Sequence, residues 1–257
     1  MALDLSGKVV IVTGGAKGIG EGCVIKLLES KAKVVVFDLD DQFKNKDKVE
    51  SFKVDLTKES EVKNAIGEVV AKFGRIDGLI NCAGIQTYGS ILDTTEEVWD
   101  KTFAVNVKSM FFTSKHAAAV MVKQKSGSIV NISSVQSTNS QKTVVAYASS
   151  KGAINTFTRA SALDLAEFNI RVNSILPGSV DTPMLRASAE MHRGEKSIDE
   201  VLTEWGKGHP LGRIAQPTEI GDLATYLVSD HSTFITGSSI VIDGGLTVQV
   251  PVVLPEK

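Results

Sequence analysis

The sequence predicts one α/β domain, with a doubly wound, seven-stranded parallel sheet flanked by helices. Short runs rich in Val and Ile alternate with helix-length amphipathic stretches through most of the 257 residues, which is the pattern of repeated strand–helix–strand units. That length is enough for one such domain with a full core and does not demand two. No linker, repeat or low-complexity tract interrupts the alternation, so we expect residues 1–257 to form a single domain.

Seven runs carry the strand pattern, because they are short, rich in β-branched residues and bounded by turn residues. They span residues 9–13, 33–37, 51–54, 78–81, 128–132, 171–176 and 239–242. Helical periodicity is strongest over residues 98–121 and 144–168. The segment between the second and third strands, residues 39–50, is near the minimum for a parallel crossover, so we expect a loop or a single turn there.

Composition excludes several classes of function. The formal net charge is −2, which gives no broad electrostatic case for binding nucleic acid or an anionic membrane. Cys23 and Cys82 are far apart with no paired spacing, which favours reduced thiols in a reducing compartment. The first residues lack the pattern of a signal peptide, and no apolar run approaches the roughly 18 residues of a membrane span. We therefore expect a cytoplasmic protein.

A glycine-rich segment follows the first strand. Residues 13–20 read Thr-Gly-Gly-Ala-Lys-Gly-Ile-Gly, and a helix pattern begins directly after them. Glycines let the backbone turn tightly and approach a pyrophosphate, while the helix N-terminus supplies amide donors and a favourable dipole. A glycine-rich string alone is weak evidence, but a strand before it and a helix after it predict a Rossmann-like dinucleotide-binding domain.

Two acidic residues follow the next strands. Asp38 lies where such a domain carries the carboxylate that binds the adenosine ribose hydroxyls, unless it is simply a turn residue. A carboxylate there repels the extra phosphate of NADP, so the sequence favours NAD. Lys17 is the opposing signal, because a basic side chain in the glycine loop can attract that phosphate. Asp55 either accepts a hydrogen bond from the adenine amino group or caps the helix that begins near residue 57.

Polar residues mark two further positions. Residues 81–84, Asn-Cys-Ala-Gly, follow the fourth strand, and small residues at such a strand end allow close approach of a ligand. Asn106 lies among apolar residues of the helix predicted over 98–121. An amide in that setting commonly caps a neighbouring backbone group, so a structural role for Asn106 stays open.

The segment Tyr147-Ala-Ser-Ser-Lys151 lies in the helix predicted over 144–168. Residues four apart share a helix face, so the phenol and the ammonium would point into the same space. A tyrosine titrates near ~10, and a neighbouring ammonium can lower that pKa so that the phenol serves as a base. Ser134, after the fifth strand, can present its hydroxyl beside the phenol. The alternative is an ordinary exposed pair of side chains.

Together these motifs resemble the classical short-chain dehydrogenase/reductase family, over residues 8–245. They are T-G-x-x-x-G-x-G at 13–20, N-x-A-G at 81–84, Asn106, Ser134, Y-x-x-x-K at 147–151, Pro-Gly at 177–178 and Asp-Gly-Gly at 243–245. The resemblance implies that Tyr147 is the general acid/base and that Ser134 holds the substrate oxygen. It implies that Lys151 lowers the tyrosine pKa and binds the nicotinamide ribose, and that Asn106 positions a water as a proton relay.

The resemblance also implies the cofactor site and the assembly. The cofactor-binding residues would be Gly14, Lys17, Gly18, Ile19, Gly20, Asp38, Asp55, Asn81, Ala83, Gly84, Tyr147, Lys151, Pro177, Gly178, Val180 and Thr182. No metal is implied, and the four histidines are scattered. A homotetramer is expected through the two long helices and the final strand region, supported by the apolar tail at 248–254. Cys82 departs from the asparagine that is usual in the family's N-N-A-G form.

The second half of the chain carries the signals for substrate. We divide the domain into a cofactor half, about 1–130, and a catalytic and substrate half, about 131–257, with a substrate lid at about 180–213. Gln86, Ser134, Gln136, Asn139, Tyr147 and Ser179 are the candidate substrate residues. Neutral hydrogen-bonding side chains suit a substrate with several hydroxyls, although they can also be solvated loop residues.

Three stretches, at 131–136, 180–213 and 245–256, together with the short second crossover, resemble the aldose 1-dehydrogenase branch. This resemblance implies NAD-dependent oxidation of a neutral sugar at C1 to its lactone. The alternatives are a related dehydrogenase or ketoreductase acting on a polyol, hydroxy acid or cyclic alcohol, and a cofactor-binding sensor without turnover. Ser134, Tyr147 and Lys151 are all intact, which argues against the sensor.

Overall fold

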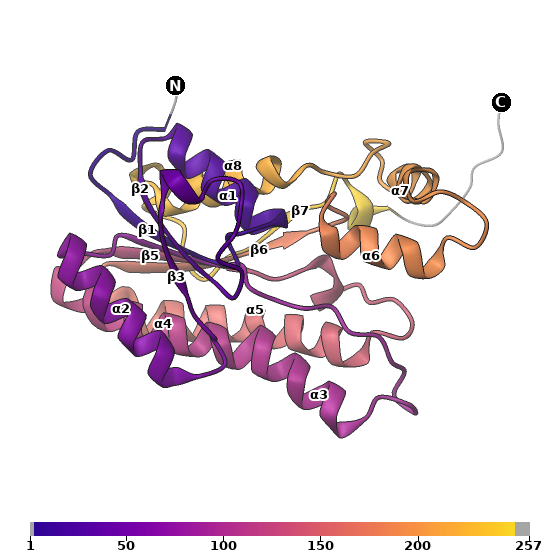
Figure 1. The fold of residues 1–257 in the computed structure, drawn as a ribbon, viewed down its shortest axis with the longest axis horizontal. Helices are drawn as coiled ribbons and strands as arrows, with labels where there is room; N and C mark the ends of the chain where they lie inside the picture. The colour runs from indigo at the N-terminus through magenta and orange to yellow at the C-terminus, as the bar shows by residue number, and fades with distance from the viewer. Residues whose placement is uncertain (1–2, 250–257) are drawn as a thin grey trace.

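The computed structural model describes residues 3–249 and is built on a parallel seven-stranded sheet with the strand order β3-β2-β1-β4-β5-β6-β7 (Figure 1). The chain starts near the middle and winds outward in both directions, so the order reverses between β1 and β4. The strands are β1 Val9–Thr13, β2 Lys33–Asp38, β3 Glu50–Lys53, β4 Gly78–Asn81, β5 Gly127–Ile132, β6 Ile170–Pro177 and β7 Ser239–Ile242. Each prediction is confirmed to within one residue at either end.

Helices cover both faces of the sheet. Figure 1 shows α1 and α8 on one face and α2, α4 and α5 on the other, with α6 and α7 beside β7. The helices are α1 Gly18–Glu29, α2 Glu59–Phe73, α3 Glu96–Phe103, α4 Ser109–Gln124, α5 Val145–Ala166, α6 Pro183–His192, α7 Ile198–Lys207 and α8 Pro217–Val228. Alternate residues of β1 serve the two faces: Ile11 packs in one core cluster and Val12 in the other.

The sequence predicts the connection between β2 and β3 but not the turn that lies between α3 and α4. Between β2 and β3 there is only the short 3₁₀ turn Lys46–Lys48, as expected for so short a segment. The helix predicted over 98–121 is confirmed as a continuous helical segment, but a π-helical turn, Ala104–Lys108, which the sequence did not predict, lies between α3 and α4. A π turn widens the backbone locally and recurs at functional sites. Asn106 lies in this turn.

The predicted lid folds as α6 and α7, with a small core of its own around Ala189, Val201 and Leu202. Thr182 caps α6 by accepting a hydrogen bond from the Leu185 N–H, and Ser197 begins α7 in a capping box. The apolar tail predicted at 248–254 lies outside the described residues from position 250 onward.

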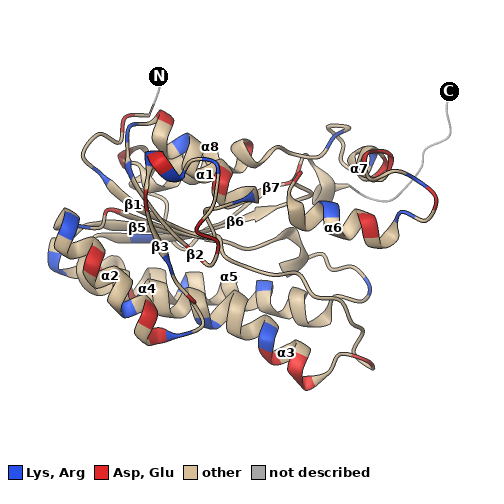
Figure 2. Ribbon diagram, viewed as in Figure 1, with Lys and Arg blue, Asp and Glu red and all other residues tan. Residues whose placement is uncertain are grey.

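Charged side chains of both signs are interspersed along the outer helices (Figure 2). That distribution gives no sign of a nucleic-acid interface on this view of the molecule. Within residues 3–249, no helix combines the length and the apolar character needed to cross a membrane.

Candidate active site

The glycine loop between β1 and α1 passes directly over the segment that follows β4. A Cβ atom at Gly14 would lie 2.8 Å from the Ala83 Cα, and the backbone of Gly14 has φ +65°. A Cβ at Gly20 would lie 2.0 Å from the Gly14 carbonyl oxygen. Both positions therefore require glycine, which keeps the loop tight at the point where the strand order reverses.

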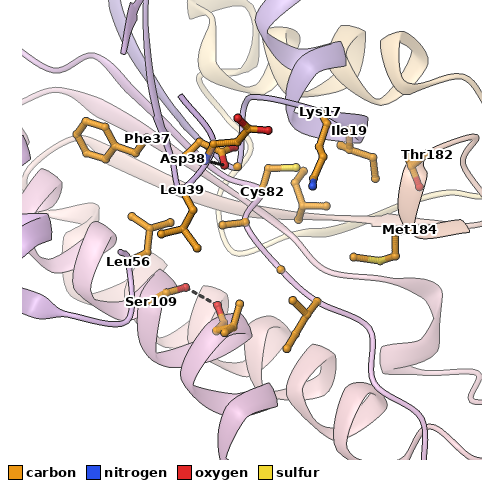
Figure 3. Close-up of a pocket in the computed structure, with 18 of the residues that line it drawn as sticks. Lys17, Ile19, Phe37, Asp38, Leu39, Leu56, Cys82, Ser109, Thr182 and Met184 are labelled. Atoms are coloured by element: carbon orange, nitrogen blue, oxygen red, sulfur yellow. Dashed lines mark hydrogen bonds between the residues drawn. The ribbon is translucent and has the colours of Figure 1, made fainter. Parts of the chain in front are cut away.

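A cavity of about 370 Å³ runs from this loop to Tyr147 and Lys151. Figure 3 shows Lys17, Asp38 and Leu39 around it, with Thr182 and Met184 at the far side. Eleven of the predicted cofactor residues line it: Gly14, Lys17, Gly18, Ile19, Asp38, Asp55, Ala83, Gly84, Tyr147, Lys151 and Thr182. Gly20 shapes the loop from outside the cavity, whereas Pro177, Gly178 and Val180 line the neighbouring cavity.

The carboxylate of Asp38 is fixed by two backbone N–H groups, those of Ala16 at 3.0 Å and Asp40 at 3.0 Å. It is therefore held at the cavity wall with a defined orientation. Lys17 forms no ion pair within residues 3–249 and extends toward the cavity (Figure 3). Asp55 accepts hydrogen bonds from Thr57, which lower its pKa and shape the turn before α2, and it also lines the cavity. Asp55 does not cap α2, which has Lys58 as its N-cap without a side-chain hydrogen bond, and the contact of Asp55 with adenine stays a prediction.

Asn81 does not reach the cavity. Its amide nitrogen donates to Ser114 Oγ at 3.0 Å and to Asn131 Oδ1 at 2.9 Å, and its oxygen accepts from Thr113 Oγ1 at 2.6 Å. Asn131 in turn donates to Thr158. This buried network ties β4, β5, α4 and α5 together, so the structure gives Asn81 a structural position rather than the predicted cofactor contact.

Tyr147 and Lys151 are both buried on α5, with the ammonium 5.5 Å from the centre of the phenol ring. Lys151 Nζ donates to the Ile132 carbonyl at 3.0 Å. Burial raises the pKa of Tyr147 to about 12, although its hydrogen bond with Ser134 opposes the shift. Burial also lowers the pKa of Lys151 to about 8. Desolvation is thus the largest cause of both shifts, and the lowering of the tyrosine pKa by Lys151 stays a prediction.

Asn106 fastens the segment after β4 to the helices. Its oxygen accepts from the Ile85 N–H at 2.8 Å, and its nitrogen donates to the Ile85 carbonyl at 2.9 Å and to Ser150 Oγ at 3.0 Å. The capping alternative is thus what the structure shows. A Cβ at Gly84 would lie 3.3 Å from Asn106 Oδ1 and 3.8 Å from Lys151 Nζ, so Asn106 and Lys151 flank the same space.

A second cavity, of about 820 Å³, adjoins the first. All six predicted substrate residues line it: Gln86, Ser134, Gln136, Asn139, Tyr147 and Ser179. The two cavities share Ile19, Ser133, Tyr147, Thr182 and Met184, so the phenol of Tyr147 lies where they meet. A hydroxyl bound in the second cavity can therefore face both the phenol and the end of the first cavity.

Sequence reasoning missed several residues of this second cavity. Tyr88 bonds through its hydroxyl to the Ser188 hydroxyl on α6 and packs against the His192 ring, with ring centres 5.6 Å apart. His209 is buried, where its Nε2 accepts from the Ser179 N–H at 3.2 Å and its Nδ1 contacts the Trp205 carbonyl at 3.1 Å. No local pattern marks these positions, because the packing of residues 180–213 brings them together from distant segments.

Sequence comparison relates this chain to known reductases and dehydrogenases. Residues 14–247 match the family model described as enoyl-(acyl carrier protein) reductase. The chain is 36% identical over 249 residues to a cyclopentanol dehydrogenase of Comamonas testosteroni, covering 93% of this chain and 97% of that protein. It is 38% identical over 250 residues to the dehydrogenase/reductase SDR family member 6 of Xenopus laevis, covering 94% of this chain and 98% of that protein.

The solved structure of the ligand-free aldohexose dehydrogenase of Thermoplasma acidophilum superposes with a TM-score of 0.94 at 35% identity, covering 98% of both chains. The glycine loop and the cavity that ends at Tyr147 fit the nicotinamide cofactor that the family uses. This chain therefore belongs to the short-chain dehydrogenase/reductase family, and its resemblance to the aldose dehydrogenase branch is supported.

Proposed function

We propose that this chain is an NAD-dependent oxidoreductase that oxidises an aldose at C1 to the lactone. The observation that carries the proposal is the second cavity, where neutral hydrogen-bonding side chains gather beside Ser134 and Tyr147. A sugar presents several hydroxyls, each of which needs a partner once it leaves water. The likeness to an aldohexose dehydrogenase over 98% of both chains supports the same substrate class.

Within the first cavity, the chain's own groups would hold the cofactor. The glycine loop and the N-terminus of α1 would bind the pyrophosphate, and Asp38 would accept hydrogen bonds from the adenosine ribose. Lys151 would bind the nicotinamide ribose. When bound, the oxidised cofactor supplies the hydride acceptor.

The residues at the junction of the cavities would handle the proton. Ser134 would donate a hydrogen bond to the substrate oxygen, and Tyr147 Oη would take the proton of the hydroxyl that is oxidised. With its pKa near 12, the phenol needs a positive charge to act as a base near neutral pH, and the neighbouring Lys151 ammonium is placed to supply it. For the reverse reaction Tyr147 would donate the proton. Asn106 would position the water that links Lys151 to solvent.

Preference for NAD over NADP is the finer part of the proposal. The fixed carboxylate of Asp38, at the end of β2, would repel a phosphate on the ribose, because two negative charges would lie side by side. Lys17 works in the opposite direction, but its chain is flexible and its charge is not fixed by any ion pair within residues 3–249. Like-charge repulsion from an oriented carboxylate is the stronger effect.

A second substrate class, a cyclic or other secondary alcohol, is favoured by a specific observation. One of the similar proteins, from Comamonas testosteroni, is a cyclopentanol dehydrogenase, and apolar side chains also line the second cavity, among them Val135, Leu185, Trp205 and Leu246. The test is reduction of NAD or NADP at 340 nm across aldoses, polyols, cyclic alcohols and hydroxy acids, with Tyr147→Phe as the blank. Turnover of aldoses supports the proposal, whereas turnover of cyclic alcohols alone overturns the sugar assignment.

We also propose a homotetramer whose contacts use α4 and α5, with residues 180–213 closing over the substrate as a lid. Phe111 on α4 is 43% exposed and Leu163 on α5 is 81% exposed, and such apolar side chains are stabilised when another copy covers them. Leu163→Glu should lower the mass measured by light scattering. The matched exposed substitution Asp164→Asn should not, and an unchanged mass for Leu163→Glu would contradict this assembly.

A further inference from the structure

The side-chain amide of Gln136 lines the second cavity and lacks hydrogen-bond partners. Its Oε1 atom is buried and has none, and within residues 3–249 its Nε2 forms no hydrogen bond either. The other buried oxygen without a partner among these residues, Thr225 Oγ1, belongs to the buried face of α8 and lines neither of the two joined cavities. Gln136 is thus a polar group beside the reaction centre whose capacity the protein itself leaves unused.

The backbone that carries this amide is fixed relative to the Ser134 hydroxyl. Gln136 lies in the 3₁₀ turn Val135–Ser137, and its backbone N–H donates to Ser134 Oγ at 3.1 Å. The turn is closed by Ser137, whose hydroxyl donates to the Ser134 carbonyl at 2.6 Å and accepts from Asn155 Nδ2 at 2.8 Å. The backbone that carries Gln136 is therefore held rigidly two residues from Ser134.

An amide in this place discriminates between substrates. The accessible edge of the amide, its Nε2, can hold a water while the cavity is hydrated, but a substrate methylene would displace that water without replacing the hydrogen bond. A substrate hydroxyl would replace it. A site that leaves a polar group unpaired with one substrate and paired with another selects strongly for the second.

We propose that Gln136 is a specificity-determining residue whose side-chain amide forms a hydrogen bond with a second hydroxyl of the substrate, other than the hydroxyl that is oxidised. The site therefore selects polyhydroxylated substrates over alcohols with a single hydroxyl. This inference rests on the proposed function only in taking the second cavity as the substrate site, and it does not require that the substrate be an aldose.

The test compares cyclohexanol with the cis and trans forms of 1,2-cyclohexanediol, which share one ring and differ by the second hydroxyl. Gln136→Met keeps the length of the side chain and removes the amide. The preference for the better diol, as a ratio of kcat/KM values, should fall at least 10-fold, which corresponds to about 1.4 kcal/mol. Gln136→Glu retains an acceptor and should retain most of the preference.

The matched control is Gln141→Met, because Gln141 lines the same cavity from an exposed position. It should leave the ratio unchanged, and the KM for the cofactor should stay constant in all variants. Where turnover is too slow to measure, binding of the same alcohols in the presence of NAD is followed by Trp205 fluorescence in a Trp99→Phe background, since Trp205 lines the cavity.

If Gln136→Met lowers kcat/KM equally for cyclohexanol and the diols, or leaves their ratio unchanged in any other way, the inference is overturned. The proposed function fails separately. If aldoses are not oxidised but the diol preference depends on Gln136, the sugar assignment falls and the inference stands. If aldoses are oxidised but the diol preference is the same with and without the Gln136 amide, the inference falls and the proposed function stands.

Discussion

Replacing Lys151 with Met should change how stability depends on pH. The side chain is 6% exposed, and burial lowers its pKa from 10.5 to about 8. Between these values the unfolded chain holds a proton that the folded chain has released, so the free energy of unfolding rises with pH. Each unit of pKa difference is worth about 1.4 kcal/mol, so this one group makes the free energy of unfolding about 3 kcal/mol smaller below pH 8 than above pH 10.5.

The measurement is urea unfolding of the wild type and Lys151→Met at several pH values from 7 to 10.5. Other groups also titrate there, among them Cys82, whose pKa burial raises to about 12. Because the charges of Cys82 and Lys151 influence each other, both proteins carry Cys82→Ala, and the effects of the remaining groups are common and cancel in the difference. The lost hydrogen bond to the Ile132 carbonyl shifts the variant by an amount that does not depend on pH.

The difference in free energy of unfolding, wild type minus variant, should therefore increase by about 1.4 kcal/mol per pH unit between pH 8 and pH 10.5. Parallel curves for the two proteins would refute the reasoning. They would mean that the ammonium is solvated or paired in a way that the buried position does not show.

Two further predictions follow from the cofactor cavity. Gly14→Ala places a Cβ 2.8 Å from the Ala83 Cα at φ +65°, so it should weaken cofactor binding, measured by calorimetry, at least 10-fold. The control is Gly67→Ala, in open space on α2. Equal affinity of the two variants for the cofactor would contradict the role of the loop. Asp38→Ala with Leu39→Arg should move the ratio of kcat/KM values toward NADP, and an unmoved ratio would show that the ribose is recognised elsewhere.

The strands and the glycine loop were predictable because their signals are local. A buried parallel strand needs a continuous apolar run, and the loop needs glycine at Gly14 and Gly20. The six predicted substrate residues follow strand ends or lie on α5, and parallel strand ends meet at one edge of the sheet.

The errors have a common physical origin. Position after a strand does not tell which way a side chain turns, so Asn81 was placed in the cofactor site although it bonds in the interior. Burial is a property of the whole fold, so the raised pKa of Tyr147 was invisible in the spacing of Tyr147 and Lys151. Tyr88 and His209 are brought to one cavity only by the packing of residues 180–213 against the rest of the domain.

Transfer of the C1 hydrogen is the most direct test of the proposed reaction. An aldose labelled with deuterium at C1 is incubated with the enzyme and NAD, and the reduced cofactor is analysed by mass spectrometry. The account predicts that deuterium enters the cofactor with the wild type, that the lactone appears in equal amount, and that Tyr147→Phe abolishes both. Reduced cofactor without deuterium, or oxidation of cyclic alcohols while aldoses remain untouched, would contradict it.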